Sequence, residues 1–397
     1  MWGETDRSYV IKVMIVFLLG WAVIYADRTV LYPMLNIIGQ DLGLSATQEG
    51  LITSVYFFFY VTMQIPSGIL GDKYCLKKVL VVMFFLAGVS LLLMGILPPA
   101  YLTLMVLVAL HGTGGGAYFP AAMGITLETV PKKMRGLSTA IVSSGMSIGL
   151  ALGLISAGPI YNYFSNWRMP FLILSIPTII LALVFHFVLR ECKPSPTEKG
   201  PISWMLRERN LMLICVASFA SQYGFWTVVT WGPTFLQTER GLGMTVSGLY
   251  TAIVAFTAIP ASLTIGNSSD RFGRKKLSLL LLSLAALTVF ATGYVQSLRA
   301  LIIVLICYGL FGKLTWDPIE ISWFADHVSA IRPELMGTSL AFFNFIGMSA
   351  AIVAPVISGW LKDTTGSLQT SFYLGGAILA LGALSLFFVD ETVNMKT

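Results

Sequence analysis

The sequence predicts an all-α membrane protein with twelve transmembrane helices arranged in two six-helix repeats. Three observations support this fold class: an apolar composition, a series of long apolar segments, and polar loops that occur twice. Of the 397 residues, 56% are hydrophobic and only 11% are charged, whereas soluble domains carry about 25% charged residues. With a mean hydropathy of +0.80, the chain lacks the polar side chains to cover itself in water, so lipid is its expected solvent.

Twelve apolar segments are long enough to cross a bilayer, which takes roughly 20 residues per helix. They lack the alternating pattern of membrane strands, and a helix satisfies its own backbone hydrogen bonds in lipid. The polar N-terminus runs into the first segment without a small-residue cleavage site, which favours a membrane helix over a signal peptide. The expected helices span approximately 11–33, 47–70, 79–97, 101–125, 137–161, 170–189, 211–236, 245–268, 277–295, 301–324, 336–360 and 371–389.

The positions of the Lys and Arg residues predict the orientation of the chain. An even number of spans puts both termini on one side, and 19 of the 25 Lys and Arg residues fall on that side. Four fall on the other side, while Arg28 and Lys313 fall inside spans. The positive-inside rule makes the first side cytoplasmic. The net charge of +6 is thus a topology signal, and we expect membrane lipids but no nucleic acid as partners.

The sequence contains no pattern typical of an enzyme. We find no nucleotide-binding loop, no His/Cys set with metal-ligand spacing and no nucleophile–base arrangement. We therefore expect no catalytic residues, no cofactor and no metal site. Cys75, Cys192, Cys215 and Cys307 are scattered, so we interpret them as reduced thiols rather than disulfides or metal ligands.

The longest polar stretch divides the chain into two halves with matching loops. The expected domains are an N-terminal six-helix bundle (1–190), a cytoplasmic linker (191–210) and a C-terminal six-helix bundle (211–397). Two parallel six-helix repeats with a solute path between them are a known transporter plan. The matching loops follow the second and eighth spans and contain Gly68, Asp72 and Lys73 in the first half and Gly266, Asp270, Arg271, Gly273 and Arg274 in the second.

With these loops the chain resembles the major facilitator superfamily over nearly its whole length. The family pattern is Gly-x-x-x-Asp-Arg/Lys-x-Gly-Arg-Lys/Arg-Lys/Arg, and the second loop matches it fully. The first loop departs from it, with Cys75 and Leu76 at the later Gly and Arg positions. The resemblance implies transport by alternating access, rather than a receptor or a channel. It also implies that the two loops form a cytoplasmic latch that holds the halves together in the outward-facing state.

A narrower resemblance is to the anion:cation symporter branch of that family. The branch moves small organic anions such as sugar acids and carboxylates, usually with protons. Its members often have an Arg in the middle of the fourth span and an acidic residue seven positions later, where this chain has His111 and Tyr118. The coupling scheme of the branch therefore does not carry over directly. The resemblance lies in 25–31, Pro33, 64–68 and 231–236.

Ionisable side chains inside spans are the candidate transport residues, because each is costly in the bilayer interior unless paired or wet. Asp27 and Arg28 are adjacent on the first span and point about 100° apart. The planar guanidinium of Arg28 suits a carboxylate, although a structural ion pair with another span is the alternative. Lys313, Asp317 and Glu320 share one face of the tenth span. We expect these three side chains to line a cavity. The alternative is an intrahelical salt bridge that contributes only to the stability of the helix.

Uncharged and weakly basic residues complete the candidate site. His111 can carry a proton near neutral pH, or it is a neutral packed histidine. Its neighbouring glycines allow close helix packing. Aromatic and amide side chains line the solute path or serve packing alone, and these are Tyr25, Tyr118, Gln222, Tyr223 and Trp226.

The preferred interpretation is proton-coupled symport of a small organic anion in the plasma (inner) membrane of a prokaryote. The anion would meet Arg28 and Lys313, and Asp27, Asp317 or Glu320 would bind the proton. The alternative is proton-coupled efflux of a drug or metabolite. An anion importer needs cationic groups in its cavity and a cation exporter needs acidic ones, and this sequence contains both. The expected partners are the solute, the proton and lipids, and the protein is expected to act as a monomer.

Overall fold

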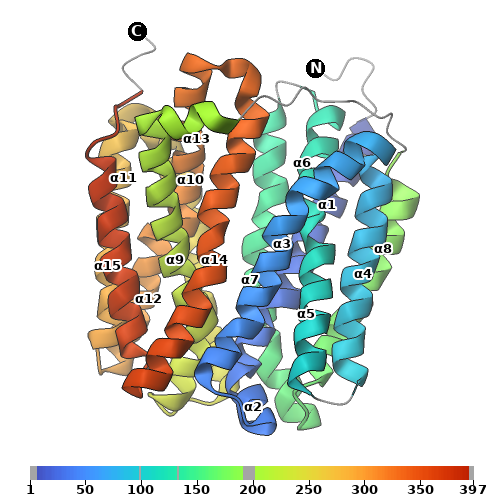
Figure 1. The fold of residues 1–397 in the computed structure, drawn as a ribbon, viewed down its shortest axis with the longest axis vertical. Helices are drawn as coiled ribbons and strands as arrows, with labels where there is room; N and C mark the ends of the chain where they lie inside the picture. Colours follow the sequence, from blue (N-terminus) through green and yellow to red (C-terminus); the bar gives the residue numbers. More distant parts are fainter. Residues whose placement is uncertain (1–6, 98–99, 132–133, 191–201, 393–397) are drawn as a thin grey trace. The chain divides into compact units, whose positions relative to one another are not determined.

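The fold is built from helices throughout the part of the chain that the structure describes. The computed structural model describes residues 7–97, 100–131, 134–190 and 202–392. Within these ranges, eleven helical segments are long and apolar enough to cross a membrane. A further helix, α3 (Ala46–Tyr74), completes the expected series of twelve. The all-α class is confirmed, and Figure 1 shows the helices in their order along the chain.

Several of the twelve spans consist of two helices. The first six spans comprise α1 (Arg7–Thr29), α2 (Leu31–Leu42), α3, α4 (Leu76–Ile96), α5 (Tyr101–Gly116), α6 (Tyr118–Thr129), α7 (Arg135–Phe164) and α8 (Met169–Val188). The second six comprise α9 (Arg209–Thr238), α10 (Met244–Phe272), α11 (Arg274–Tyr294), α12 (Leu298–Phe311), α13 (Lys313–Ile331), α14 (Met336–Thr365) and α15 (Gln369–Leu386). A short 3₁₀ helix, Ile202–Arg207, precedes α9, and another, Pro333–Leu335, precedes α14.

Spans one, four and ten are interrupted, each beside residues that the sequence singled out. Pro33 and Pro120 lie four residues after the ends of α1 and α5, and a proline has no N–H to continue the helical hydrogen bonds. The third break is at Gly312, whose extended backbone separates α12 from α13. Interrupted spans are typical of transporter binding sites. The break in span one comes just after Arg28. The breaks in spans four and ten come directly before Tyr118 and Lys313.

The chain divides into two compact units, and each is described by itself. The first unit contains Met1–Leu44 and Val55–Thr197, and the second contains Ser45–Ser54 and Glu198–Thr397. The division after Thr197 falls within the segment expected to be a linker, of which residues 191–201 lie outside the described ranges. The assignment of the start of α3 to the second unit has no counterpart in the sequence analysis.

A stripe of glycines places α1 directly against α7 in the first unit. Gly145, Gly149 and Gly153 lie four residues apart and so share one face of α7. A Cβ at any of the three would clash with a backbone carbonyl oxygen of α1. This close approach runs up to the turn that bears Asp27 and Arg28. The carbonyls belong to Leu18, Ala22 and Ala26.

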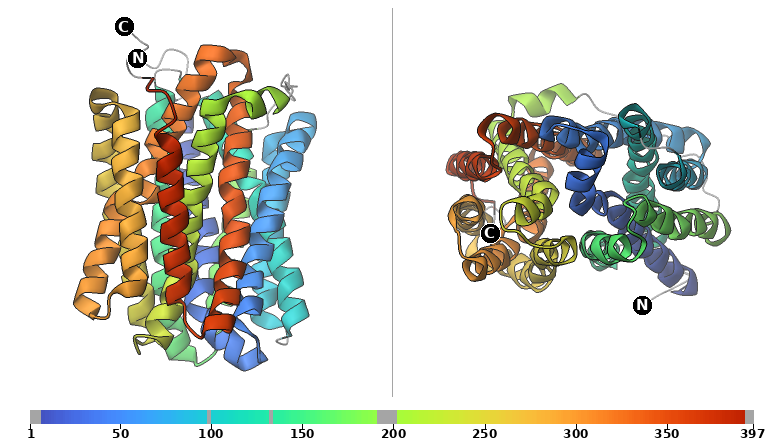
Figure 2. Two further views of the ribbon diagram at one scale, coloured as in Figure 1. Left: turned by 60° about the vertical axis from the view of Figure 1, so that its left-hand side comes forward. Right: turned by 90° about the horizontal axis from the view of Figure 1, so that it is seen from below.

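The same pairs of spans pack together in each unit. In the first unit, span one packs along span five (α1 with α7) and span three along span six (α4 with α8). In the second unit, the equivalent pairs are α9 with α14 and α11 with α15. Figure 2 shows the helices of each unit end-on. The repeat seen in the loops thus extends to the helix packing.

In the second unit, the start of α3 and the helices α11 and α15 receive N-terminal caps from carboxylates that are distant in sequence. Asp363 on α14 accepts hydrogen bonds from the backbone N–H groups of Ala46 and Thr47, both at 2.8 Å. Glu239 caps α15 and Glu391 caps α11 in the same way. Negative charge is favourable at a helix N-terminus because the first N–H groups lack partners there.

Candidate functional site

Arg28 lies buried in the first unit among aromatic rings. It is 3% exposed, and its guanidinium carbon lies 3.4 Å from the centre of the Tyr25 ring. The Phe57 and Tyr60 rings of α3 lie 5.3 Å and 5.7 Å away. Tyr56 interacts with the same guanidinium electrostatically. The aromatic faces stabilise the cation, and the phenols add hydrogen-bonding groups beside it.

Asp27 faces a different neighbour from Arg28. Its Oδ2 accepts a hydrogen bond from the Thr178 hydroxyl of α8 at 2.7 Å. Its side chain is buried, and Oδ1 has no hydrogen-bond partner among the described residues. The 100° step between adjacent helical residues accounts for the two directions. A buried carboxylate with one hydroxyl partner is a group that can take up a proton.

His111 lies close to the Arg28 site, whereas Tyr118 lies in the core. His111 Nδ1 is 3.1 Å from the Ala87 carbonyl oxygen, which can only accept, so Nδ1 carries the proton. Its ring is 5.3 Å from the Tyr56 ring. The Tyr118 hydroxyl donates to the Phe17 carbonyl oxygen at 2.5 Å, within an aromatic cluster of α1, α4 and α8. The surroundings of the two residues adjoin, because Ala87 belongs to the same cluster and Tyr118 interacts electrostatically with Tyr60.

Lys313, Asp317 and Glu320 meet on one face of α13 in the second unit. Lys313 Nζ lies 2.5 Å from both carboxylate oxygens of Asp317. Glu320 is 2% exposed and interacts with the side chains of Asp317 and Ser218. The other face of α13 packs into the core, where the Trp316 indole donates to Ser278 on α11. The hydrophobic face thus fixes the orientation of the charged one.

The candidate residues of α9 are buried in the second unit. The Trp226 indole donates to Gln222 Oε1 at 3.0 Å, and the Gln222 amide lies 3.5 Å from the sulfur of Met348 on α14. Gln222 and Ser218 are one turn apart on α9, so Gln222 lies on the side that faces Glu320. Tyr223 is 1% exposed, and its hydroxyl has no hydrogen-bond partner among the described residues.

The second latch loop is held by acidic groups of its own unit. Gly273 has a φ of +90°, which glycine tolerates, and it leads into α11. Arg274 forms a 3.0 Å ion pair with Asp326 of α13. In the first loop Lys73 is exposed, and a Cβ added at Gly68 would meet no atom of the described residues within 4 Å. Four latch positions lie outside the part of the chain whose side chains are described: Asp72, Gly266, Asp270 and Arg271.

Cys75 corrects one expectation from the sequence. It is disulfide-bonded, and its partner lies outside the described residues, whereas Cys215 and Cys307 are free thiols. The expectation that all four cysteines are reduced was wrong because spacing along the chain does not tell which loops meet in space. Cys75 also has a φ of +108°, at the position equivalent to Gly273, so a non-glycine residue adopts this conformation in the first half.

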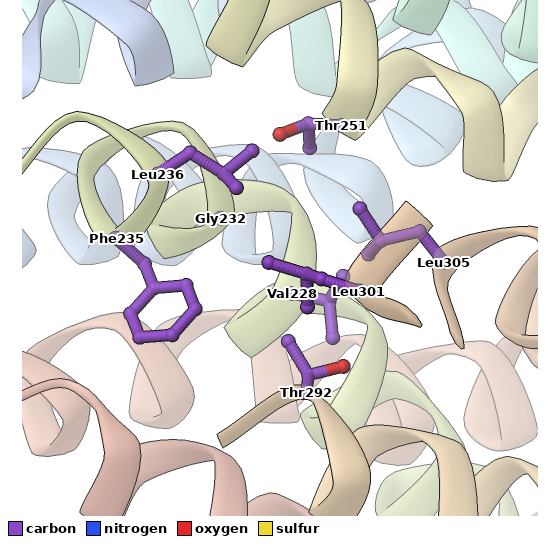
Figure 3. Close-up of a pocket in the computed structure, with 8 residues that line it drawn as sticks. All are labelled: Val228, Gly232, Phe235, Leu236, Thr251, Thr292, Leu301 and Leu305. Atoms are coloured by element: carbon purple, nitrogen blue, oxygen red, sulfur yellow. The ribbon is translucent and has the colours of Figure 1, made fainter. Parts of the chain in front are cut away.

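A small pocket in the second unit is separate from the charged residues. It lies among α9, α10, α11 and α12 (Figure 3), and none of the residues that line it is charged. The hydroxyls of Thr251 and Thr292 donate to carbonyl oxygens of their own helices. The pocket therefore offers no group that would hold an anion. Its lining is Val228, Gly232, Phe235, Leu236, Thr251, Thr292, Leu301 and Leu305.

The sequence analysis missed residues that surround the charged candidates. Tyr56 and Tyr60 belong to an apolar run of α3, although their spacing of four places them on one helix face. Thr178 and Ser218 are single hydroxyls in apolar spans, and neither carries a signal of its own. The regular spacing of the two tyrosines was the one signal that would have found part of this shell.

Comparison with known proteins identifies the family. The family model described as Major Facilitator Superfamily matches residues 17–355 and, in a second match, 214–397. A probable sulfoacetate transporter of Cupriavidus necator is 25% identical over 422 residues, covering 96% of this chain and 94% of that protein. A hexuronate transporter of Bacillus subtilis is 25% identical over 407 residues, covering 94% and 93%.

A solved structure shares the fold. It is described as a bacterial homolog of the human lysosomal transporter Spinster in an inward-facing and occupied conformation. The likeness has a TM-score of 0.82 at 16% identity and covers 96% of this chain and 97% of that chain. The helix order, the repeated packing and the family match agree, and the chain belongs to the major facilitator superfamily of membrane transporters and is not an enzyme.

Proposed function

We propose that the protein carries a small organic anion, a carboxylate or a sugar acid, across the plasma (inner) membrane of a prokaryote together with protons, by alternating access. The relatives whose names state a solute support the class of solute, since sulfoacetate and hexuronates are small organic anions. The single observation that carries the proposal is the buried guanidinium of Arg28 among the rings of Tyr25, Phe57 and Tyr60.

Arg28 combines the properties that an anion site in a span requires. Its charge is permanent, and its fork of N–H donors matches the two oxygens of a carboxylate. The charge acts more strongly in a low-dielectric interior than in water. Tyr56 and Tyr60 lie close enough to interact with it, and phenol hydroxyls can also bond the hydroxyls of a sugar acid. Lys313 is the second cationic candidate.

Carboxyl groups in both units supply the proposed proton acceptors; those of Asp27 and Glu320 are buried, and that of Asp317 is partly exposed. Asp27 in the first unit and Asp317 and Glu320 in the second are the candidates. A proton that binds with the anion offsets its charge, and this lowers the cost of moving the charge through a low-dielectric region. His111 interacts with Arg28 electrostatically. Proton binding by His111 can therefore depend on whether an anion is bound to Arg28.

Reconstituted protein tests the proposal directly. We expect proteoliposomes to accumulate radiolabelled sulfoacetate or D-glucuronate when the outside is more acidic, and a protonophore should abolish the accumulation. Purified Arg28→Lys keeps the charge but loses the two-pronged fit, so its affinity for the anion should fall while some transport survives. Arg28→Ala should abolish binding.

Melting temperature measured on the same Arg28→Ala protein separates a substrate role from a structural one. If Arg28 instead pairs with a carboxylate of the protein, the variant leaves that carboxylate buried without a counter-ion. The melting temperature should then fall, whether or not anion binding changes. Protonation at low pH should then rescue it. A well-folded Arg28→Ala that binds its anion with unchanged affinity would refute the anion site. Transport of organic cations outward against an inward proton gradient would favour the efflux alternative.

A further inference from the structure

The face of α13 in the second unit carries one cation and two carboxyl groups. Both oxygens of Asp317 lie 2.5 Å from Lys313 Nζ, so Asp317 compensates the charge of the lysine. Glu320 follows Asp317 by three residues and is buried more deeply. Its Oε2 has no hydrogen-bond partner among the described residues. Two carboxylates that share one cation cannot both ionise without leaving a buried charge uncompensated.

We propose that Glu320 is the proton-binding group of the second unit, and that Asp317 is the fixed counter-ion of Lys313. The proton binds to the carboxyl group of Glu320, which leaves the cluster with no net charge. Its loss leaves the cluster with one negative charge. This inference rests on the proposed function for its link to transport, but the proton site itself rests on the geometry of α13.

The groups around Glu320 support this assignment. Ser218 of α9 interacts with its carboxyl group and can bond it in either protonation state. The charged groups acting on it are Lys313 and Asp317 on its own helix. Glu320 in turn acts on Cys215 of α9. Among the residues with described side chains, α10, α11, α12 and α14 bring no further charged group that acts on Glu320.

Lys313 has a different role from Arg28 under this proposal. A solute carboxylate that bound Lys313 would first displace Asp317 from two contacts and leave it beside Glu320. Arg28 is surrounded by aromatic rings, and its neighbour Asp27 bonds to Thr178. We therefore assign the anion to the first unit and a proton to the second. Because Lys313 contacts both oxygens of Asp317, Glu320 is the carboxyl group left to bind the proton.

Infrared spectroscopy of the purified protein in lipid tests the proton site without any solute. The wild type should show the C=O stretching band of a buried protonated carboxyl group, which disappears as pH is raised. Glu320→Gln should lose this band. In Asp317→Asn, Lys313 is left to pair with Glu320, so the band should persist only to lower pH than in the wild type.

The charge-neutral double variant Lys313→Gln with Asp317→Asn is the matched control. It removes the ion pair but leaves Glu320 buried beside Ser218, so the band should remain. A band that survives in Glu320→Gln and disappears in Asp317→Asn at every pH would overturn the assignment. So would a double variant that loses the band, because Glu320 would then depend on the ion pair itself.

Transport assays link the proton site to coupling. With sulfoacetate or D-glucuronate as probe, Glu320→Gln should exchange external for internal anion as the wild type does. Accumulation driven by the proton gradient should be lost, so that the concentrations inside and outside become equal. Gradient-driven accumulation by Glu320→Gln at the wild-type level would overturn the inference. If the wild type moves neither anion while the band is lost in Glu320→Gln, the proposed function fails and the proton site stands.

Discussion

Asp363 allows a stability prediction whose size follows from the structure. Its carboxylate accepts hydrogen bonds from the N–H groups of Ala46 and Thr47 and from the Thr47 hydroxyl. Ala46 is 6% exposed, so Asp363→Ala leaves one buried donor without its partner. The loss of such a cap costs about 1 kcal/mol. Water replaces the bonds to Thr47, which is partly exposed, and these bonds add little.

The charge of Asp363 adds a second contribution. A carboxylate at a helix N-terminus stabilises by about 0.5 kcal/mol at an exposed position. The sum for Asp363→Ala is therefore about 1.5 kcal/mol. For a body of about 200 residues this corresponds to a fall in melting temperature of about 3–6 °C. Asp363→Asn keeps one acceptor oxygen and loses only the charge, so its melting temperature should fall by about 1–2 °C.

The melting temperatures of these variants can be measured with a thiol-reactive dye. In a Cys307→Ser background, which removes the partly exposed free thiol, the buried Cys215 reacts with the dye only when the second unit opens. Thr364→Ala is the matched control, because Thr364 is the exposed next residue of α14 and its hydroxyl bonds only within α14. If Asp363→Ala and Thr364→Ala had the same melting temperature, the cap would be refuted as a source of stability.

Three further predictions concern the latch, the packing of the first unit and the topology. Arg274→Ala should slow transport more than it lowers stability, and adding Asp326→Asn should recover part of the rate because no carboxylate is then stranded; unchanged initial rates in the single variant would contradict this. Gly149→Val should lower expression and melting temperature, since a Cβ there clashes with the α1 backbone; a wild-type melting curve would argue against the close packing. A single cysteine at Arg207, in a chain without its native cysteines, should react with an impermeant maleimide only after the cells are opened, and labelling of intact cells would reverse the predicted orientation.

The sequence predicted the spans well and drew attention to the charged candidates, because both depend on local properties. An apolar run of about 20 residues has one stable arrangement in lipid. A charged residue inside such a run stands out whatever its tertiary contacts. Arg28 and Lys313 became candidates in this way. The spacing of Lys313 and Asp317 also predicted their proximity, because residues four apart share a helix face.

Features that depend on tertiary contacts were not predicted. Tyr56 and Tyr60 occur in an aromatic run, and a hydropathy argument does not distinguish rings that face lipid from rings that face Arg28. The disulfide at Cys75 and the interruption beside Gly312 depend on loops and helices that meet only after folding. The cap at Asp363 joins groups on different spans, which no local pattern reveals.

The distant cap of α3 has a consequence for the biosynthesis of the protein. Asp363 follows Ala46 by 317 residues, and at ribosomal rates this separation corresponds to tens of seconds. The start of α3 therefore enters the membrane before its cap exists and stays incompletely bonded until α14 is made. A nascent chain stalled after α8 would contain all of α3 but lack the partner of its first turn. We infer that Ser45–Ser54 is among the last parts of the first six spans to reach its final structure.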